Sequence, residues 1–201
     1  MSNKGILYVI SAPSGCGKGT ILGEIMKSFD NIHFSVSATT RLPREGEQNG
    51  INYYFISREE FEAEIGCGGM LEYAEFCGNY YGTPRSKVFE KLDAGFDVIL
   101  EIETVGAMKV KKAYPDAVLV FILPPNVETL RKRLIGRGTE TIDVIERRVG
   151  EAANEIEKAY NYDFVIINDD LTDAVERLSN VMKSCKYMTK FNTNTIKGVL
   201  D

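Results

Sequence analysis

The chain has 201 residues, of which 44% are hydrophobic, and a formal net charge of −5. This length is typical of one domain with a sizeable core. The negative charge argues against a nucleic-acid-binding or anionic-membrane surface, and no apolar run approaches the ~18 residues of a transmembrane helix. The four cysteines form no C-x-x-C pair and the chain has one histidine, so we expect neither a zinc site nor disulfides, and we expect a cytoplasmic location.

Four short apolar runs indicate buried parallel strands. They lie at residues 6–11, 98–102, 118–123 and 164–167, with helical patterns between them. This alternation is typical of an α/β fold in which helices cover a parallel sheet. We therefore expect an α/β core in a single domain.

A glycine-rich loop follows the first run and precedes a helical pattern. It reads S-A-P-S-G-C-G-K-G-T from Ser11 to Thr20. Glycines let successive N–H groups point inward, and the following helix adds the positive end of its dipole, so the loop suits a phosphate group. The match to G-x-x-x-x-G-K-[ST] is imperfect, because Ala12 replaces the first glycine and Gly19 stands where a hydroxyl residue is expected. We predict that Lys18 meets the phosphates of a nucleotide.

Cys16 lies inside this loop. A nearby helix N-terminus and Lys18 are features that lower a thiol pKa, which predicts a reactive cysteine. Burial as an inert filler is the alternative.

The segment at residues 34–84 does not fit the alternation. It mixes short strand-like pieces with Ser, Thr, Arg, Gly and Tyr, and glycine-rich breaks indicate a small separate lobe. Arg41, Arg44 and Tyr53 together suit a phosphate monoester. Glu72, with hydroxyls and aromatic rings after it, suits a flat heterocycle that has N–H donors. Taken alone, Arg41 and Arg44 are better explained by an ordinary charged loop, and Tyr80 and Tyr81, taken singly, are better explained by packing.

A second irregular segment covers residues 126–158. Asn126 and Thr141 are placed to cap two helices, and Gly136-Arg137-Gly138 separates them. We expect a helical lid here. The tail at residues 183–201 is predicted to be helical.

Five blocks of sequence resemble guanylate kinases, in order and at the family's spacing. They are residues 11–20, 35–55, 78–83, 136–138 and 165–170. The resemblance implies a P-loop NTPase fold with a parallel sheet core (1–33, 85–125 and 159–201), a GMP-binding lobe (34–84) and a helical lid (126–158). It also implies transfer of the γ-phosphoryl group of ATP, with Mg²⁺, to GMP or dGMP, in purine nucleotide metabolism and GMP recycling.

The same resemblance implies a role for each matching residue. ATP would be bound by Ala12, Pro13, Ser14, Gly15, Cys16, Gly17, Lys18, Gly19, Thr20, Arg133, Arg137 and Asn168, with Thr20 at the metal. GMP would be bound by Ser37, Arg41, Arg44, Tyr53, Glu72, Tyr81, Thr83, Glu101 and Glu103. Catalysis would depend on Lys18, Arg41, Arg137 and Arg148.

Glu101 and Glu103 end a predicted strand at residues 97–102. Alternation along a strand places both carboxylates on one face, at the end of the sheet where ligands bind. Many guanylate kinases have D-I-D-x-Q here, whereas this chain has E-I-E-T-V, so Val105 lacks the amide. A solvated acidic strand end is the alternative.

Two other functions stay open at this stage. One is an interaction module that has kept the fold and lost turnover, against which Lys18, Thr20 and the lid arginines argue. The other is a kinase for AMP or a pyrimidine monophosphate. Glu72 argues against it, because adenine has an acceptor at N1 where guanine has a donor. The sequence leaves open whether the protein is a monomer or a homo-oligomer.

Overall fold

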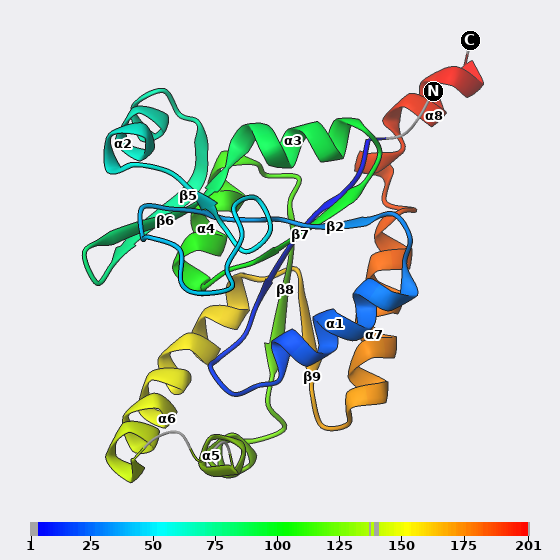
Figure 1. Cartoon of the computed structure of the whole chain (residues 1–201). Coiled ribbons are helices and arrows are strands. Elements are labelled where there is room, and N and C mark those ends of the chain that lie inside the picture. Colours follow the sequence, from blue (N-terminus) through cyan, green and yellow to red (C-terminus); the bar gives the residue numbers. More distant parts are fainter. Residues whose placement is uncertain (1–3, 137, 139–140, 201) are drawn as a thin grey trace.

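The structure is a computed structural model that describes residues 4–136, 138 and 141–200. At its centre is a five-stranded parallel sheet with the strand order β2-β7-β1-β8-β9 (Figure 1). Its strands are β1 (Leu7–Ser11), β2 (Ile32–Phe34), β7 (Asp97–Glu101), β8 (Val118–Leu123) and β9 (Phe164–Ile167). The expected α/β fold with a parallel core is confirmed, although the short strand β2 was not predicted.

Two apolar clusters cover the two faces of this sheet. Tyr8 and Ile10 of β1 face one cluster, and Leu7 and Val9 face the other, as the alternation of a strand requires. The helices of the first cluster are α1 (Lys18–Ser28) and α7 (Leu171–Cys185), and those of the second are α3 (Arg85–Asp93) and α4 (Thr104–Ala113). Both faces of the sheet are therefore covered over its central strands, whereas Val165 and Ile167 of the edge strand β9 are exposed.

A second, four-stranded sheet lies within residues 34–84 and has the order β4-β3-β6-β5. Its elements are β3 (Ala38–Thr39), β4 (Tyr54–Phe55), β5 (Met70–Phe76) and β6 (Asn79–Pro84), with helix α2 (Arg58–Gly66) between β4 and β5. Ser57 and Glu60 form a capping box at the start of α2. The ring of Phe61 in α2 is fully buried and stacks on Tyr80 of β6, which fixes the helix to the sheet.

Residues 126–158 form two helices, α5 (Val127–Gly136) and α6 (Ile142–Glu157). Asn126 caps α5 as predicted, because its Oδ1 accepts a 2.8 Å hydrogen bond from the backbone N–H of Thr129. Thr141 occupies the cap position of α6, but its side chain makes no capping hydrogen bond. Leu130 and Leu134 pack against the apolar face of α6 and against Cys16. The pair of helices is thus attached to the glycine-rich loop.

The C-terminal part continues after β9 with α7, a 3-10 turn (Thr189–Phe191) and α8 (Thr193–Leu200), and a further 3-10 turn (Lys158–Asn161) links α6 to β9. Lys186 forms an ion pair with the buried carboxylate of Asp97. Helix α8 buries none of its residues and projects from the body (Figure 1). Within the described part of the chain, no helix combines the length and apolarity needed to cross a membrane.

Candidate active site

The loop between β1 and α1 has the geometry of a phosphate-binding loop. Gly15 and Gly17 adopt φ of +90° and +80°, and Gly17 is the N-cap of α1. A Cβ at Gly15 would lie 2.8 Å from Leu134, and one at Gly17 would lie 2.7 Å from Asn168 Nδ2. Backbone conformation and close packing therefore both require glycine at these two positions.

A cavity of about 530 Å³ lies over this loop. It is lined by residues 12–20 together with Glu101, Glu103 and Glu155. Nζ of Lys18 lies 3.6 Å from Oε1 of Glu101, so the lysine stands between the loop and the end of β7. All nine loop residues predicted to bind a nucleotide line this one cavity.

The structure contradicts the prediction that Cys16 is a reactive thiol. Its side chain is 1% exposed and packs among Leu130, Leu134 and the apolar face of α6. Burial raises the pKa of the Cys16 thiol to about 12 and outweighs the opposite effects of Arg133 and Lys18. The thiol is therefore neutral at physiological pH, and the residue acts as a core residue of the loop.

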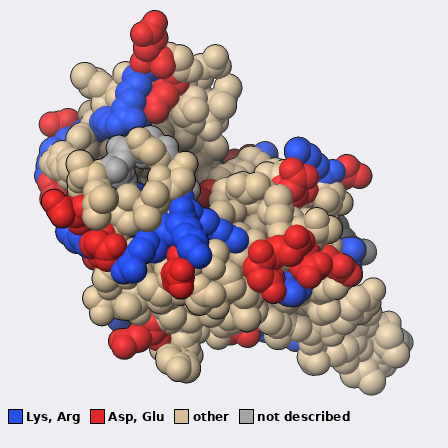
Figure 2. Space-filling view, turned by 90° about the horizontal axis from the view of Figure 1, so that it is seen from below, with Lys and Arg blue, Asp and Glu red and all other residues tan. Residues whose placement is uncertain are grey.

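Helices α5 and α6 bring two of the predicted arginines to the loop. Arg133 donates from Nη2 to the backbone oxygen of Asn168 at 3.0 Å, and its buried Nη1 has no hydrogen-bond partner among the described residues. Nη1 of Arg148 donates to Oγ of Ser14 at 3.3 Å. Arg137 lies outside the described residues. Figure 2 shows Lys and Arg side chains gathered in a patch at this end of the molecule, bordered by Asp and Glu.

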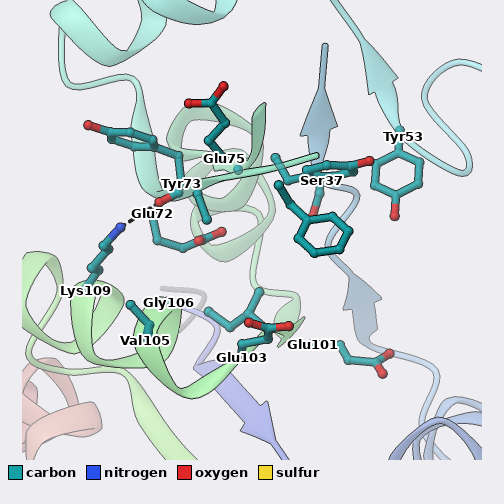
Figure 3. A pocket seen from close by; sticks show the side chains of 15 residues that line it. Ser37, Tyr53, Glu72, Tyr73, Glu75, Glu101, Glu103, Val105, Gly106 and Lys109 are labelled. Carbon is teal, nitrogen blue, oxygen red and sulfur yellow. Dashed lines mark hydrogen bonds between the residues drawn. The ribbon is translucent and has the colours of Figure 1, made fainter. Parts of the chain in front are cut away.

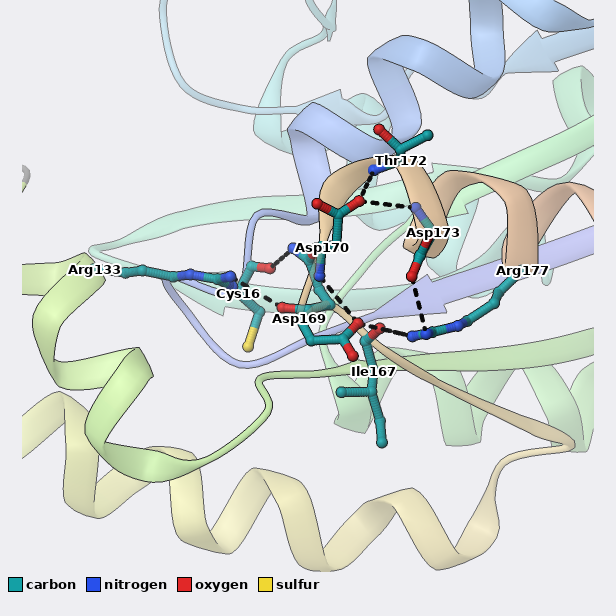
Figure 4. A network of polar contacts seen from close by, with 9 residues as sticks. Cys16, Arg133, Ile167, Asp169, Asp170, Thr172, Asp173 and Arg177 are labelled. Carbon is teal, nitrogen blue, oxygen red and sulfur yellow. Dashed lines mark hydrogen bonds and ion pairs between the residues drawn. The ribbon is translucent and has the colours of Figure 1, made fainter.

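Asn168 supports the phosphate loop. Its side chain is buried, and its Nδ2 donates to the backbone oxygen of Cys16 at 2.6 Å. The chain after it is fixed, because Arg177 pairs with Asp169 and the Asp170 carboxylate caps α7 (Figure 4). Asn168 thus joins the end of β9 to the loop.

A second cavity, of about 380 Å³, lies between the small sheet and the amino end of α4 (Figure 3). Four of its lining residues are predicted GMP-binding residues of the lobe: Ser37, Tyr53, Glu72 and Tyr81. Glu101 and Glu103 also line it, so the two cavities share these carboxylates. Strand β7 ends at Glu101, and Glu103 is the N-cap of α4, which places the pair at the carboxyl end of the sheet as predicted.

Glu72 is one of the carboxylates that line the second cavity. Its Oε1 accepts a 2.7 Å hydrogen bond from Oγ1 of Thr83, which is buried behind it and does not line the cavity. Burial raises the pKa of Glu72, and the bond from Thr83 and the charge of Lys109 partly oppose that effect. The site therefore holds a desolvated acceptor that one of its neighbours already orients.

Arg41 and Arg44, the two arginines predicted to bind GMP, are not among the residues that line the second cavity. Arg41 forms an ion pair with Glu47 at 2.9 Å, and its guanidinium lies 5.5 Å from the ring centre of Tyr53. The backbone N–H of Arg44 donates to the other oxygen of Glu47. Glu47 thus connects the side chain of Arg41 to the backbone of Arg44 and holds this part of the chain in the conformation seen here.

Comparison with known proteins gives consistent results. A family model described as guanylate kinase matches residues 4–185. The chain belongs to the guanylate kinase family. It is 47% identical over 205 residues to the guanylate kinase of Listeria monocytogenes serotype 4b (strain F2365), covering 100% of this chain and 98% of that protein.

Two further guanylate kinases are similar over most of the chain. That of Enterococcus faecalis (strain ATCC 700802 / V583) is 51% identical over 185 residues, covering 92% of this chain and 91% of that protein. The crystal structure of guanylate kinase from Anaplasma phagocytophilum superimposes with a TM-score of 0.71 at 35% identity, covering 94% of this chain and 89% of that one.

Sequence reasoning missed several residues of this guanylate kinase site. Glu47 carries no motif and becomes visible only through its pairing with Arg41. Glu155 lines the phosphate-loop cavity from the last turns of α6. Lys109 lines the second cavity, and its Nζ donates to the backbone oxygen of Tyr73. Each is a common surface residue type, and only the fold brings it to the site.

Proposed function

We propose that this member of the guanylate kinase family transfers the γ-phosphoryl group of ATP to GMP, giving ADP and GDP. The observation that supports this most is the pair of cavities that share Glu101 and Glu103. A triphosphate over the phosphate loop and a monophosphate in the second cavity would direct their phosphates toward this common boundary. The arrangement is suited to direct transfer between two bound nucleotides.

In the proposed reaction an oxygen of the GMP phosphate attacks the γ-phosphorus of ATP. The bond from that phosphorus to the oxygen bridging to the β-phosphate breaks, and the electron pair leaves with ADP. Such a transfer needs no covalent intermediate with the protein, so the chain contributes positioning and neutralisation of charge.

On the ATP side, the inward N–H groups of the phosphate loop and Nζ of Lys18 would hold the phosphates. Arg133 and Arg148, at the loop from α5 and α6, are proposed to neutralise charge that develops during transfer. The buried Nη1 of Arg133 has no partner among the described residues, and a bound nucleotide would supply an acceptor for it. Arg137 is proposed for the same role from the family resemblance.

The residues around the phosphate loop fit a magnesium ion. Mg²⁺ prefers oxygen ligands and keeps several waters, with few protein ligands and the substrate phosphates completing its coordination. The Thr20 hydroxyl lines the same cavity as three carboxylates, Glu101, Glu103 and Glu155. The described residues contain no cluster of three His, Cys, Asp or Glu that could hold a metal alone. We propose Thr20 as the direct ligand; the ion, when bound with ATP, would offset phosphate charge.

On the GMP side, Glu72 is proposed to accept from guanine N1–H and from the exocyclic amine, with Ser37 near O6. Thr83 would act through Glu72, because its hydroxyl proton is already donated there. Arg41, Arg44, Tyr53 and Tyr81 are proposed to bind the GMP phosphate. When GMP binds, the guanidinium of Arg41 would leave the carboxylate of Glu47 and pair with the phosphate.

We propose that three parts of the chain have different roles. Residues 34–84 would form the GMP-binding lobe, residues 126–158 the lid, and the rest the core. Closure of lobe and lid would exclude water that otherwise hydrolyses ATP. We propose that the enzyme acts in the cytoplasm in purine nucleotide metabolism and accepts dGMP as well as GMP.

Measurement of ADP release at saturating Mg-ATP tests this function. The wild-type protein should turn over GMP and dGMP far faster than AMP, CMP or UMP. Preference for another monophosphate would indicate a different nucleotide kinase. Tight GMP binding without any ADP release would indicate a binding module and would contradict the proposal.

A further inference from the structure

The first turn of α4 packs directly against the carboxylate of Glu72. Gly106 is buried in this turn, and a Cβ built on it would lie 3.0 Å from Oε2 and 3.4 Å from Cδ of Glu72. In Figure 3, Val105 and Gly106 lie on helix α4, which faces Glu72 at the second cavity. A side chain at this position would have to displace the carboxylate or the helix.

A hydrogen bond restrains each of the two partners. Oε1 of Glu72 is held by Thr83 at 2.7 Å. The helix is tied to the strand that carries Glu72, because Nζ of Lys109 donates to the backbone oxygen of Tyr73 at 2.7 Å. Thr83 on one side and the amino end of α4 on the other thus confine the carboxylate.

The amino end of α4 also suits a negative charge. The backbone N–H groups of a first helical turn carry partial positive charge, and α4 has no acidic residue in its first turn. Glu103, its N-cap, makes no capping hydrogen bond with its side chain. The close approach that Gly106 permits brings Oε2 of Glu72 to this positive end.

We propose that Gly106 is a positioning residue for guanine specificity: its lack of a side chain sets the position of the Glu72 carboxylate that reads the base. This inference rests on the proposed function and adds a determinant that acts on the base through Glu72. To accept hydrogen bonds from two N–H donors of guanine at once, the Glu72 carboxylate must lie within about 0.5 Å of the position that forms both bonds. A methyl group at residue 106 would shift the carboxylate by a few tenths of an ångström, which approaches this tolerance.

The test compares Gly106→Ala with a matched control, Gly23→Ala. Gly23 is also helical, in α1, and a Cβ there would meet no atom within 4 Å. For both variants we would measure kcat/KM for GMP and for IMP, which lacks the exocyclic amine, GMP affinity by calorimetry, and the melting temperature.

Gly106→Ala should lower kcat/KM for GMP by about tenfold, because a shift of a few tenths of an ångström costs less than the ~10²-fold that a full-ångström misplacement can cost. IMP should lose less, because it makes fewer bonds to Glu72, so the GMP-to-IMP ratio falls. GMP affinity should fall in parallel, whereas the melting temperature should change little, because the helix preference of alanine over glycine opposes the crowding against Glu72. Gly23→Ala should keep the wild-type ratio.

A double-mutant cycle with Glu72→Asp decides the mechanism. The shorter carboxylate draws back from residue 106, so Gly106→Ala should have a much smaller effect on GMP affinity in that background than in the wild type. Equal effects in both backgrounds would overturn the inference, and so would a wild-type GMP-to-IMP ratio in Gly106→Ala, whatever its melting temperature. A wild-type protein that does not phosphorylate GMP would instead contradict the proposed function, and the wild-type measurements alone reveal that outcome.

Discussion

Thr83 and Glu72 lie on neighbouring strands of the small sheet, and the Thr83 hydroxyl donates to Oε1 of Glu72 at 2.7 Å. The bond leaves the lone pairs of Oε2, and the remaining one of Oε1, to accept from a ligand. It also favours the charged form of Glu72, whereas burial favours the neutral form. In the proposed function, the pair would couple base recognition to the ionisation of Glu72.

Thr83→Val should make GMP recognition more sensitive to acid. Burial raises the pKa of Glu72, and loss of the Thr83 hydrogen bond removes an interaction that lowers it, so the pKa rises further. Guanine needs the ionised carboxylate, so kcat/KM for GMP falls as pH decreases through this pKa. The acid limb of its pH profile should therefore shift to higher pH, with KM for ATP little changed. An acid limb at the wild-type position would contradict this role of Thr83.

Lys18→Ala should lower kcat by at least ~10²-fold, by analogy with the loss of one preorganised electrostatic stabiliser. The residue starts α1 and lines the phosphate cavity, so the fold should persist. Lys27→Ala is the matched control on the same helix, where the lysine pairs with Glu24 at the surface. Steady-state kinetics and circular dichroism check both variants, and near-normal kcat in Lys18→Ala would refute the phosphate-loop assignment.

Cys16 should resist thiol reagents in the folded protein. Its thiol is buried, and its pKa is raised to about 12, so almost no thiolate exists at neutral pH. Cys67 and Cys77 are exposed and should be modified first. Mass spectrometry after brief alkylation identifies the sites. Labelling of Cys16 ahead of both exposed cysteines, with loss of activity, would show that the loop opens readily.

Glu103→Gln should reduce catalysis or GMP affinity with little change in stability, because the carboxylate lines both cavities and is exposed to solvent. Its effect should also depend on the magnesium concentration. Glu157→Gln, at the exposed end of α6, is the control. If both variants show wild-type kinetics at all magnesium concentrations, Glu103 is merely a solvated surface residue.

The sequence was sufficient wherever a local pattern determines structure. Four apolar runs predicted β1, β7, β8 and β9. For β1, β7 and β8 the reason is that a strand buried on both faces must be apolar along its length, whereas β9 is apolar although Val165 and Ile167 are exposed. Strand β2 escaped prediction, since it has three residues and includes the polar His33. The glycine-rich loop could be placed because its conformation depends on residues adjacent in the chain.

Relationships across the fold could not be predicted in this way. The burial of Cys16 depends on Leu130 and Leu134, far away in the sequence, and it reverses the pKa shift that the helix end and Lys18 suggested. The ion pair of Arg41 with Glu47 and the approach of Gly106 to Glu72 likewise arise from packing. The roles assigned to individual site residues stay predictions.

The central claim is that Glu72 reads guanine, and Glu72→Gln tests it most directly. The glutamine side chain has the shape of glutamate, but it turns an NH₂ group toward the N–H donors of guanine. The substitution therefore removes a hydrogen bond to a charged group, which contributes about 1.5–3 kcal/mol. Because the raised pKa of the buried Glu72 means that its ionisation at neutral pH costs folding free energy, the variant should be at least as stable as the wild type without ligand.

The decisive measurement is kcat/KM for GMP, IMP and AMP with wild type and Glu72→Gln at saturating Mg-ATP. The account predicts a strong wild-type preference for GMP, an intermediate or poor rate with IMP, and a loss in Glu72→Gln that is much larger for GMP than for AMP. An equal loss for GMP and AMP would mean that Glu72 only supports the lobe, and would contradict the account.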